Sequence, residues 1–181
     1  MKHLLLAGGI LAAASLSLVS QPKAPPKSPP ETAMATIAGK EVSIKYSSPR
    51  VKGREGHIFS KDGLISHDPH YPVWRAGANA ATTLTTDTDL KIGDISVPKG
   101  TYTLFVNISD PDNWVFIVNK KTGEWGLAYD GSADLGKTEM KMSKPSALVE
   151  DLKYTIDAHD NKGTITLSWE NHTASVPIAA E

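Results

Sequence analysis

The octapeptide Thr101-Tyr102-Thr103-Leu104-Phe105-Val106-Asn107-Ile108 decides the fold class of this chain. Within it, the apolar side chains of Tyr102, Leu104, Val106 and Ile108 occupy every second position. Residues two apart in a β-strand lie on the same face of the sheet. The pattern therefore predicts a strand with one face in a hydrophobic core.

The same period-two pattern recurs on both sides of this strand. Further strands are expected over residues 35–38, 41–46, 81–86, 90–97, 114–119, 140–142, 152–156, 165–169 and 175–178. Gly39-Lys40 fits a two-residue hairpin turn, and Pro177 restricts the last strand to a sheet edge. No window predicts an amphipathic helix. We expect an all-β domain, an antiparallel β-sandwich or jelly roll of roughly eight to ten short strands.

Composition sets the limits on size and partners. The chain has 181 residues, which suits one domain, expected over residues 34–181. A net charge of -1 provides no field that would attract nucleic acid or an anionic membrane. Cysteine is absent, so disulfides, thiolate metal sites and a lipidated cysteine are excluded.

The N-terminal segment is typical of export. Residues 1–20 combine Lys2, a short apolar run and small residues, as in a secretory signal peptide. The apolar run is short for a membrane span, so no stable anchor is expected after cleavage. Residues 21–33 are rich in proline and predict a disordered linker. We expect a periplasmic or extracellular protein.

A basic segment follows the first hairpin. In residues 48–54, Arg50, Lys52 and Arg54 alternate, so they would point the same way in an extended chain. Such a cationic rim suits a carboxylate, sulfate or phosphate. A solvated loop, or salt bridges to acids such as Glu55 or Asp68, is the alternative.

The stretch of residues 71–83 concentrates donors beside apolar surface. Arg75 carries five fixed donors and Asn79 both donors and an acceptor, so the two side chains could position a polar ligand. Trp74 could provide a stacking platform for a sugar or another ring. Alternatively, Arg75 binds backbone carbonyls, Asn79 caps a turn, and Trp74 belongs to the core.

Histidines supply the remaining candidate chemistry. His67 and His70 have a ligand-like spacing, and His57 could complete a zinc or copper site. The same imidazoles could act as a general base. Pro69 makes their convergence uncertain, and no hydrolase, metalloprotease or nucleotide-binding motif is present. No cofactor is expected unless these histidines bind a metal.

Four segments together resemble a bacterial family of exported proteins called domain of unknown function 2911. They are residues 48–54, 73–82, 98–104 and Asn119-Lys120 with Trp125-Gly126, and the resemblance covers about residues 37–177. It implies an all-β exported domain with no established activity. An acid usual in the family after Gly-Ala-Asn is replaced here by Ala80, and the segment before Trp74 is longer.

Three functions are compatible with these residues. The first is a non-enzymatic domain that binds a small polar or anionic ligand where the loops of residues 49–54 and 74–79 meet, with Trp74 as a platform. The second is a periplasmic hydrolase or metal-dependent enzyme that uses His67 or His70. The third is a structural or envelope-associated module, in which internal salt bridges engage the arginines and an apolar patch is exposed.

Overall fold

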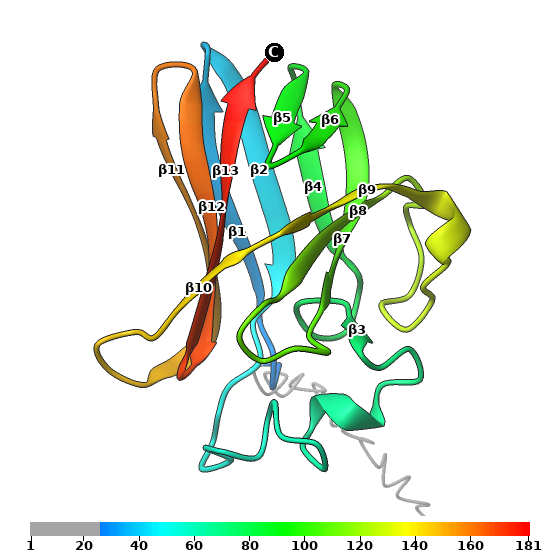
Figure 1. The fold of residues 1–181 in the computed structure, drawn as a ribbon, viewed down its shortest axis with the longest axis vertical. Coiled ribbons are helices and arrows are strands. Elements are labelled where there is room, and N and C mark those ends of the chain that lie inside the picture. Colours follow the sequence, from blue (N-terminus) through cyan, green and yellow to red (C-terminus); the bar gives the residue numbers. More distant parts are fainter. Residues whose placement is uncertain (1–25) are drawn as a thin grey trace, which may run out of the picture.

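The computed structural model describes residues 26–181. The expected signal peptide and the first part of the proline-rich segment lie outside the described residues. Two antiparallel β-sheets pack face to face, and residues 26–181 contain no α-helix (Figure 1). The expected all-β sandwich is confirmed, with thirteen strands in this part of the chain.

The first sheet holds seven strands, in the order β1-β2-β4-β7-β8-β9, with β3 also paired to β7. Their bounds are β1 (Pro30–Ile37), β2 (Lys40–Ser47), β3 (Val73–Trp74), β4 (Thr82–Thr86), β7 (Gly100–Asn107), β8 (Val115–Asn119) and β9 (Asp134–Glu139). β3 pairs with the end of β7 and β4 with its beginning. Residues 75–81 therefore form an excursion between two strands that are both anchored on β7.

The second sheet holds six strands, in the order β11-β12-β13-β5-β6, with β10 also paired to β13. Their bounds are β5 (Leu90–Ile92), β6 (Ile95–Val97), β10 (Lys141–Ser143), β11 (Val149–His159), β12 (Lys162–Glu170) and β13 (His172–Ala180). The alternating apolar residues of both sheets face inward and form one buried cluster. Burial of these side chains is the main stabilising contribution.

Several expected boundaries differ in the structure. β1 begins at Pro30 and not near residue 34, because residues 30–33 pair in register with β2. The hairpin turn is Ala38-Gly39 and not Gly39-Lys40, and both turn residues have positive φ, as two-residue turns of this type require. The strand expected over residues 90–97 is divided into β5 and β6 at Gly93, which also has positive φ.

Pro177 does not lie on a sheet edge, contrary to expectation. It belongs to β13, which has β12 on one side and β10 and β5 on the other. The Pro177 carbonyl accepts a hydrogen bond from the Gly93 backbone N–H at 2.8 Å. A backbone N–H at residue 177 would point to the same side of β13 as this carbonyl. On that side, β10 pairs with β13 only as far as Ser175 and β5 pairs only from Ile178 onward, so a gap lies opposite residue 177. A proline fits there because no partner carbonyl needs a donor.

The expectation that Thr101 to Ile108 has a single core face is also wrong. Phe105 is 2% exposed and Ile117, its partner on β8, is fully buried, although both face away from the main core. The loop of residues 120–133 covers them, and the Tyr129 ring packs 4.8 Å from that of Phe105.

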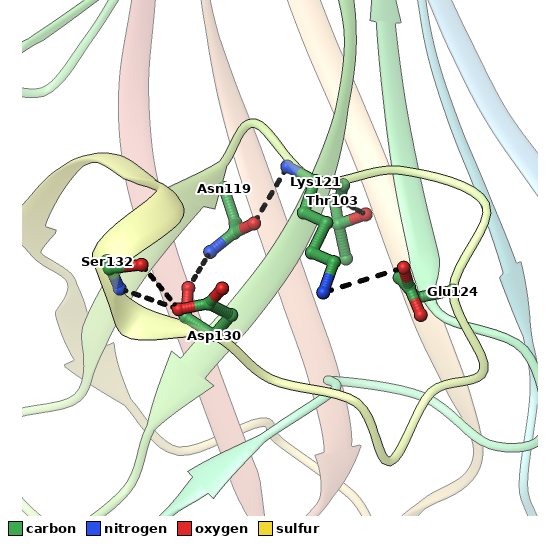
Figure 2. A network of polar contacts seen from close by, with 6 residues as sticks. All are labelled: Thr103, Asn119, Lys121, Glu124, Asp130 and Ser132. Atoms are coloured by element: carbon green, nitrogen blue, oxygen red, sulfur yellow. Dashed lines mark hydrogen bonds and ion pairs between the residues drawn. The ribbon is translucent and has the colours of Figure 1, made fainter.

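Polar contacts hold this covering loop on the sheet. Asn119 donates to the Asp130 carbonyl and accepts from the Lys121 backbone N–H, while the Asp130 side chain accepts from Ser132 (Figure 2). Thr103 donates to the Lys121 carbonyl at 2.7 Å. These bonds satisfy Thr103 and Asn119, which are almost fully buried polar side chains.

Candidate functional site

The long segment between β2 and β4 lies beyond one end of the sandwich (Figure 1). A cavity of about 680 Å³ opens there, between residues 49–54 and residues 74–78. Its volume falls in the range of small-molecule sites, roughly 300–1,000 Å³. The cavity combines apolar walls, which include Leu64, Leu127 and Trp169, with a cationic lining.

All three arginines of the chain line this cavity, which we call the arginine cavity. Arg50, Arg54 and Arg75 are the only arginines among 181 residues, and each contributes to the wall together with Lys52 and Lys27. Asp68 is the single acidic residue in the lining. The cavity therefore carries an excess of positive charge in a protein whose net charge is -1.

Arg75 is fixed by the excursion between β3 and β4. Ala76, its neighbour, has positive φ, and the Ala76 carbonyl accepts hydrogen bonds from Tyr154 at 3.1 Å and Thr82 at 3.2 Å. The Arg75 side chain is 20% exposed and forms an ion pair of 3.5 Å with Asp68. Gly126 packs directly against Arg75, since a Cβ at Gly126 would collide with its side chain.

The guanidinium of Arg75 keeps unused donors. Its Nε and Nη1 are buried and make no hydrogen bond among residues 26–181, although Nη1 lies 3.5 Å from Asp68 Oδ2 in the ion pair. A buried donor without an acceptor costs about 1–3 kcal/mol.

The other two arginines also have internal contacts. Arg50 pairs with Asp151 at 2.8 Å, and both side chains are about half exposed. Arg54 donates through Nε to the Val51 carbonyl at 3.0 Å and through Nη2 to the Arg50 carbonyl. These contacts are those expected of a structural role. An exposed ion pair such as Arg50–Asp151 nevertheless contributes only about 0–1 kcal/mol to the stability of the fold, so a ligand can replace it at little cost.

The basic segment is not extended, which corrects the expected alternation. Lys52 and Gly53 both have positive φ and form a turn, and the Arg54 backbone N–H bonds to the Val51 carbonyl. Arg50 precedes this turn in a bridge to Asp151 on β11. The turn, and not a shared strand face, brings Arg50, Lys52 and Arg54 to the same cavity.

Trp74 belongs to the core and is not a free platform. It is 3% exposed and stacks on Trp169 with the ring centres 5.9 Å apart. Its indole N–H donates to the Gly77 carbonyl at 3.2 Å. Trp74 forms part of the aromatic floor of the cavity.

Asn79 does not line the cavity, so the expected pairing with Arg75 is wrong. It is exposed, has φ of 58°, and donates to the Ser28 carbonyl at 3.3 Å. Asparagine tolerates this left-handed backbone better than most residues. Its role is to form the turn and to hold the segment before β1.

The three histidines considered as metal ligands do not converge. His67 contacts the Gly63 carbonyl through Nδ1 at 2.9 Å, His70 packs against the Tyr129 ring, and His57 lies exposed on an earlier turn. Within residues 26–181 no three His, Cys, Asp or Glu side chains could hold a metal ion together. Of the three histidines, only His67 lines the cavity.

Asp68 was not predicted to be the partner of Arg75. It lies in the segment before β3 and, in contrast to Ala80, supplies an acid beside Arg75. Ala80 instead forms a β-bridge with Trp125, which is 61% exposed. The number of residues between Asp68 and Arg75 gives no signal for this contact, because a short helical turn at Ile65–His67 and the strand β3 set the loop path.

The fold and the cavity define this chain as an antiparallel β-sandwich domain with a cationic cavity at one end. The chain belongs to the family described as "Protein of unknown function (DUF2911)", whose model matches residues 28–178. No curated protein and no solved structure matches the chain. In residues 26–181, no helix has the length and apolar character needed to cross a membrane.

Proposed function

We propose that this domain is an exported, non-enzymatic binder of a small organic anion. The observation that carries the proposal is the convergence of all three arginines of the chain on one cavity. A carboxylate accepts the paired donors of a guanidinium in a bidentate geometry, and such charge-assisted bonds are stronger than neutral ones.

The walls favour an anion that also has an apolar part. Leu64 and Leu127 are partly exposed and line the cavity beside the basic residues. Trp74 and Trp169, both almost fully buried, add aromatic rings to the lining. Apolar walls with a few placed polar groups are typical of small-molecule sites.

Calorimetric titration of the protein with benzoate, citrate and inorganic phosphate tests this function. We expect saturable binding of at least one anion, and weaker binding at high salt because the charges are screened. Arg75→Gln should weaken that binding by about tenfold or more, since charge-assisted hydrogen bonds are lost.

Lys141→Gln is the matched control, because it removes one exposed positive charge from β10, away from the cavity. It should leave the affinity unchanged. Absence of binding for all three anions, or equal affinity in Arg75→Gln and the parent protein, would overturn the proposal. If Arg75→Gln unfolds the chain, Lys52→Gln supplies the same test on an exposed residue of the lining.

A further inference from the structure

A second cavity, of about 430 Å³, lies on the other side of the Phe59 ring. Phe59 packs 5.7 Å from both Trp74 and Trp169, which line the arginine cavity. It also packs 4.9 Å from Trp114 and 4.6 Å from His172, which line the second cavity. An aromatic partition therefore separates two cavities at the same end of the sandwich.

A buried carboxylate lies at the wall of this second cavity. Glu170 occupies the turn between β12 and β13, and its side chain is 3% exposed. One carboxylate oxygen accepts the Gly56 backbone N–H at 2.6 Å, and the other lies 3.5 Å from His172 Nδ1. The backbone of Glu170 has φ of 55°, a conformation that favours glycine or asparagine. Glu170 belongs to the two-residue turn between Trp169 and His172, in which a positive φ is usual.

His172 places an imidazole at the same wall. The ring stacks on Trp114 at 5.5 Å, and 28% of the side chain is exposed. Its Nδ1 is buried and lies 3.5 Å from the Glu170 carboxylate, with no closer partner within residues 26–181. Burial lowers the pKa of His172, against an opposing effect of Glu170, and Lys144 lowers it further. This shift favours the neutral form of the imidazole.

A neutral imidazole carries one N–H and one lone pair. Because Nδ1 faces the Glu170 carboxylate, its proton belongs on Nδ1 and the lone pair on Nε2. In this tautomer Nε2 is the acceptor nitrogen of a residue that lines the second cavity. The same couple of carboxylate and imidazole positions histidines at many metal and catalytic sites.

The charges of the lining indicate the class of ligand. Lys61 and Glu170 contribute one charge of each sign, so the wall is balanced, unlike that of the arginine cavity. Ser60 and Ser109 add hydroxyls, and Tyr71, which is 40% exposed, adds an aromatic face. Acceptors and hydroxyls beside an aromatic ring fit a ligand that has many hydroxyls and one apolar face.

We propose that the second cavity binds an uncharged hydroxylated ring, such as one sugar residue, with the His172 imidazole as the acceptor that Glu170 positions and Tyr71 as the packing surface. This site is distinct from the anion site, and neither proposal depends on the other. A neutral sugar tests the second cavity alone, because it gives the arginines no charge to bind.

Nuclear magnetic resonance of the full chain tests the proposal, with glucose, mannose and N-acetylglucosamine as probes. We expect at least one sugar to shift the His172 imidazole and Tyr71 ring signals in a saturable way. The His159 signals should not move, because this imidazole is 89% exposed on a distant hairpin. Tyr71→Ala, at an exposed position, should weaken the binding about tenfold. Unmoved His172 and Tyr71 signals with all three sugars, or full affinity in Tyr71→Ala, would refute the site.

Glu170→Gln tests the positioning role of the carboxylate. With its carbonyl oxygen on the Gly56 N–H, the new amide turns its NH₂ toward His172 Nδ1. The imidazole proton should then move to Nε2, which is visible in the ring nitrogen shifts, and sugar affinity should fall about tenfold. Glu55→Gln is the matched control, since this exposed carboxylate bonds to Asn171 in the same region. An unchanged tautomer and affinity in Glu170→Gln would contradict the role of Glu170.

Discussion

Arg75 Nη1 lies 3.5 Å from Asp68 Oδ2, and the Asp68 side chain is only 7% exposed. The pair joins the segment before β3 to the excursion after it, and both residues line the arginine cavity. Asp68 also accepts the His70 backbone N–H at 3.1 Å, which fixes the carboxylate. A charged contact therefore lies at the wall of the cavity, and an anion bound there would compete with Asp68 for the same guanidinium.

Asp68→Ala should destabilise the protein by about 1–3 kcal/mol, because it leaves a largely buried guanidinium without its counter-charge. The measurement is urea denaturation. The same variant should bind an organic anion more tightly, since the competing carboxylate is gone. Asp62→Ala, an exposed acid on the same loop, is the control and should change neither quantity. Unaltered stability in Asp68→Ala would show that the pair contributes nothing.

Gly126→Ala should displace the Arg75 side chain, because the added Cβ would overlap with Arg75 and with the Asn79 carbonyl. Overpacking of this kind costs about 1–3 kcal/mol, and anion affinity should fall with it. Thermal denaturation and calorimetry measure the two effects. Gly131→Ala is the control in the same covering loop, where the nearest atom lies 3.2 Å away in the Tyr129 side chain. Equal anion affinity in both variants would argue against the contact with Arg75.

The stability of the protein should decrease as the pH falls below about 6.5, the ordinary pKa of the His172 imidazole. Burial lowers the pKa of His172 in the folded protein, so the unfolded chain binds the proton more readily. The contribution of the neutral imidazole to the free energy of unfolding is complete above pH 6.5. It is lost as the pH falls from 6.5 toward the folded-state pKa, and the free energy of unfolding then decreases by at most about 1.4 kcal/mol per pH unit.

Urea denaturation at several pH values measures this slope. His172→Asn should flatten it between pH 6.5 and the folded-state pKa of the imidazole. His159→Asn, at an exposed position, should leave the slope as it is. If His172→Asn keeps the full slope, another group causes the acid sensitivity.

Tyr129→Phe should destabilise the protein by about 1.5–3 kcal/mol, the usual contribution of a hydrogen bond to a charged group. The Tyr129 hydroxyl donates to Asp134 at 2.7 Å, and burial together with this carboxylate raises the pKa of the phenol. The change keeps the ring on Phe105, so it tests the hydrogen bond alone. Urea denaturation is the measurement, and Tyr71→Phe is the exposed control. Equal stability of the two variants would contradict this role of the bond.

Much of the architecture could be predicted from the sequence, because strand periodicity is a local signal. The alternation in residues 101–108, 152–156 and 165–169 predicted β7, β11 and β12. The second buried face of β7 could not be predicted, because Phe105 is covered by a loop that is distant in sequence. The sheet-edge position expected from Pro177 was wrong because the partners of β13 are also distant in sequence. Its missing N–H faces a gap between two other strands.

The candidate site was predicted in part. Arg50, Lys52, Arg54, Trp74 and Arg75 line one cavity, whereas Asn79 does not. His57, His67 and His70, considered as metal ligands, do not form a three-ligand group within residues 26–181. Glu170 and His172 carried no recognisable motif, and only the β12–β13 turn and the Phe59 ring make them a site.

By itself the sequence determined an all-β domain without cysteine, and it placed unusual donors in two loops. Side-chain alternation and turn residues act over a few positions, so they can be recognised without a fold. The tertiary structure alone decided which donors meet: it directed all three arginines to one cavity, paired Arg75 with Asp68, and buried Glu170 beside His172. Such contacts depend on how the two sheets pack and on the path of the long loops, which no local pattern specifies.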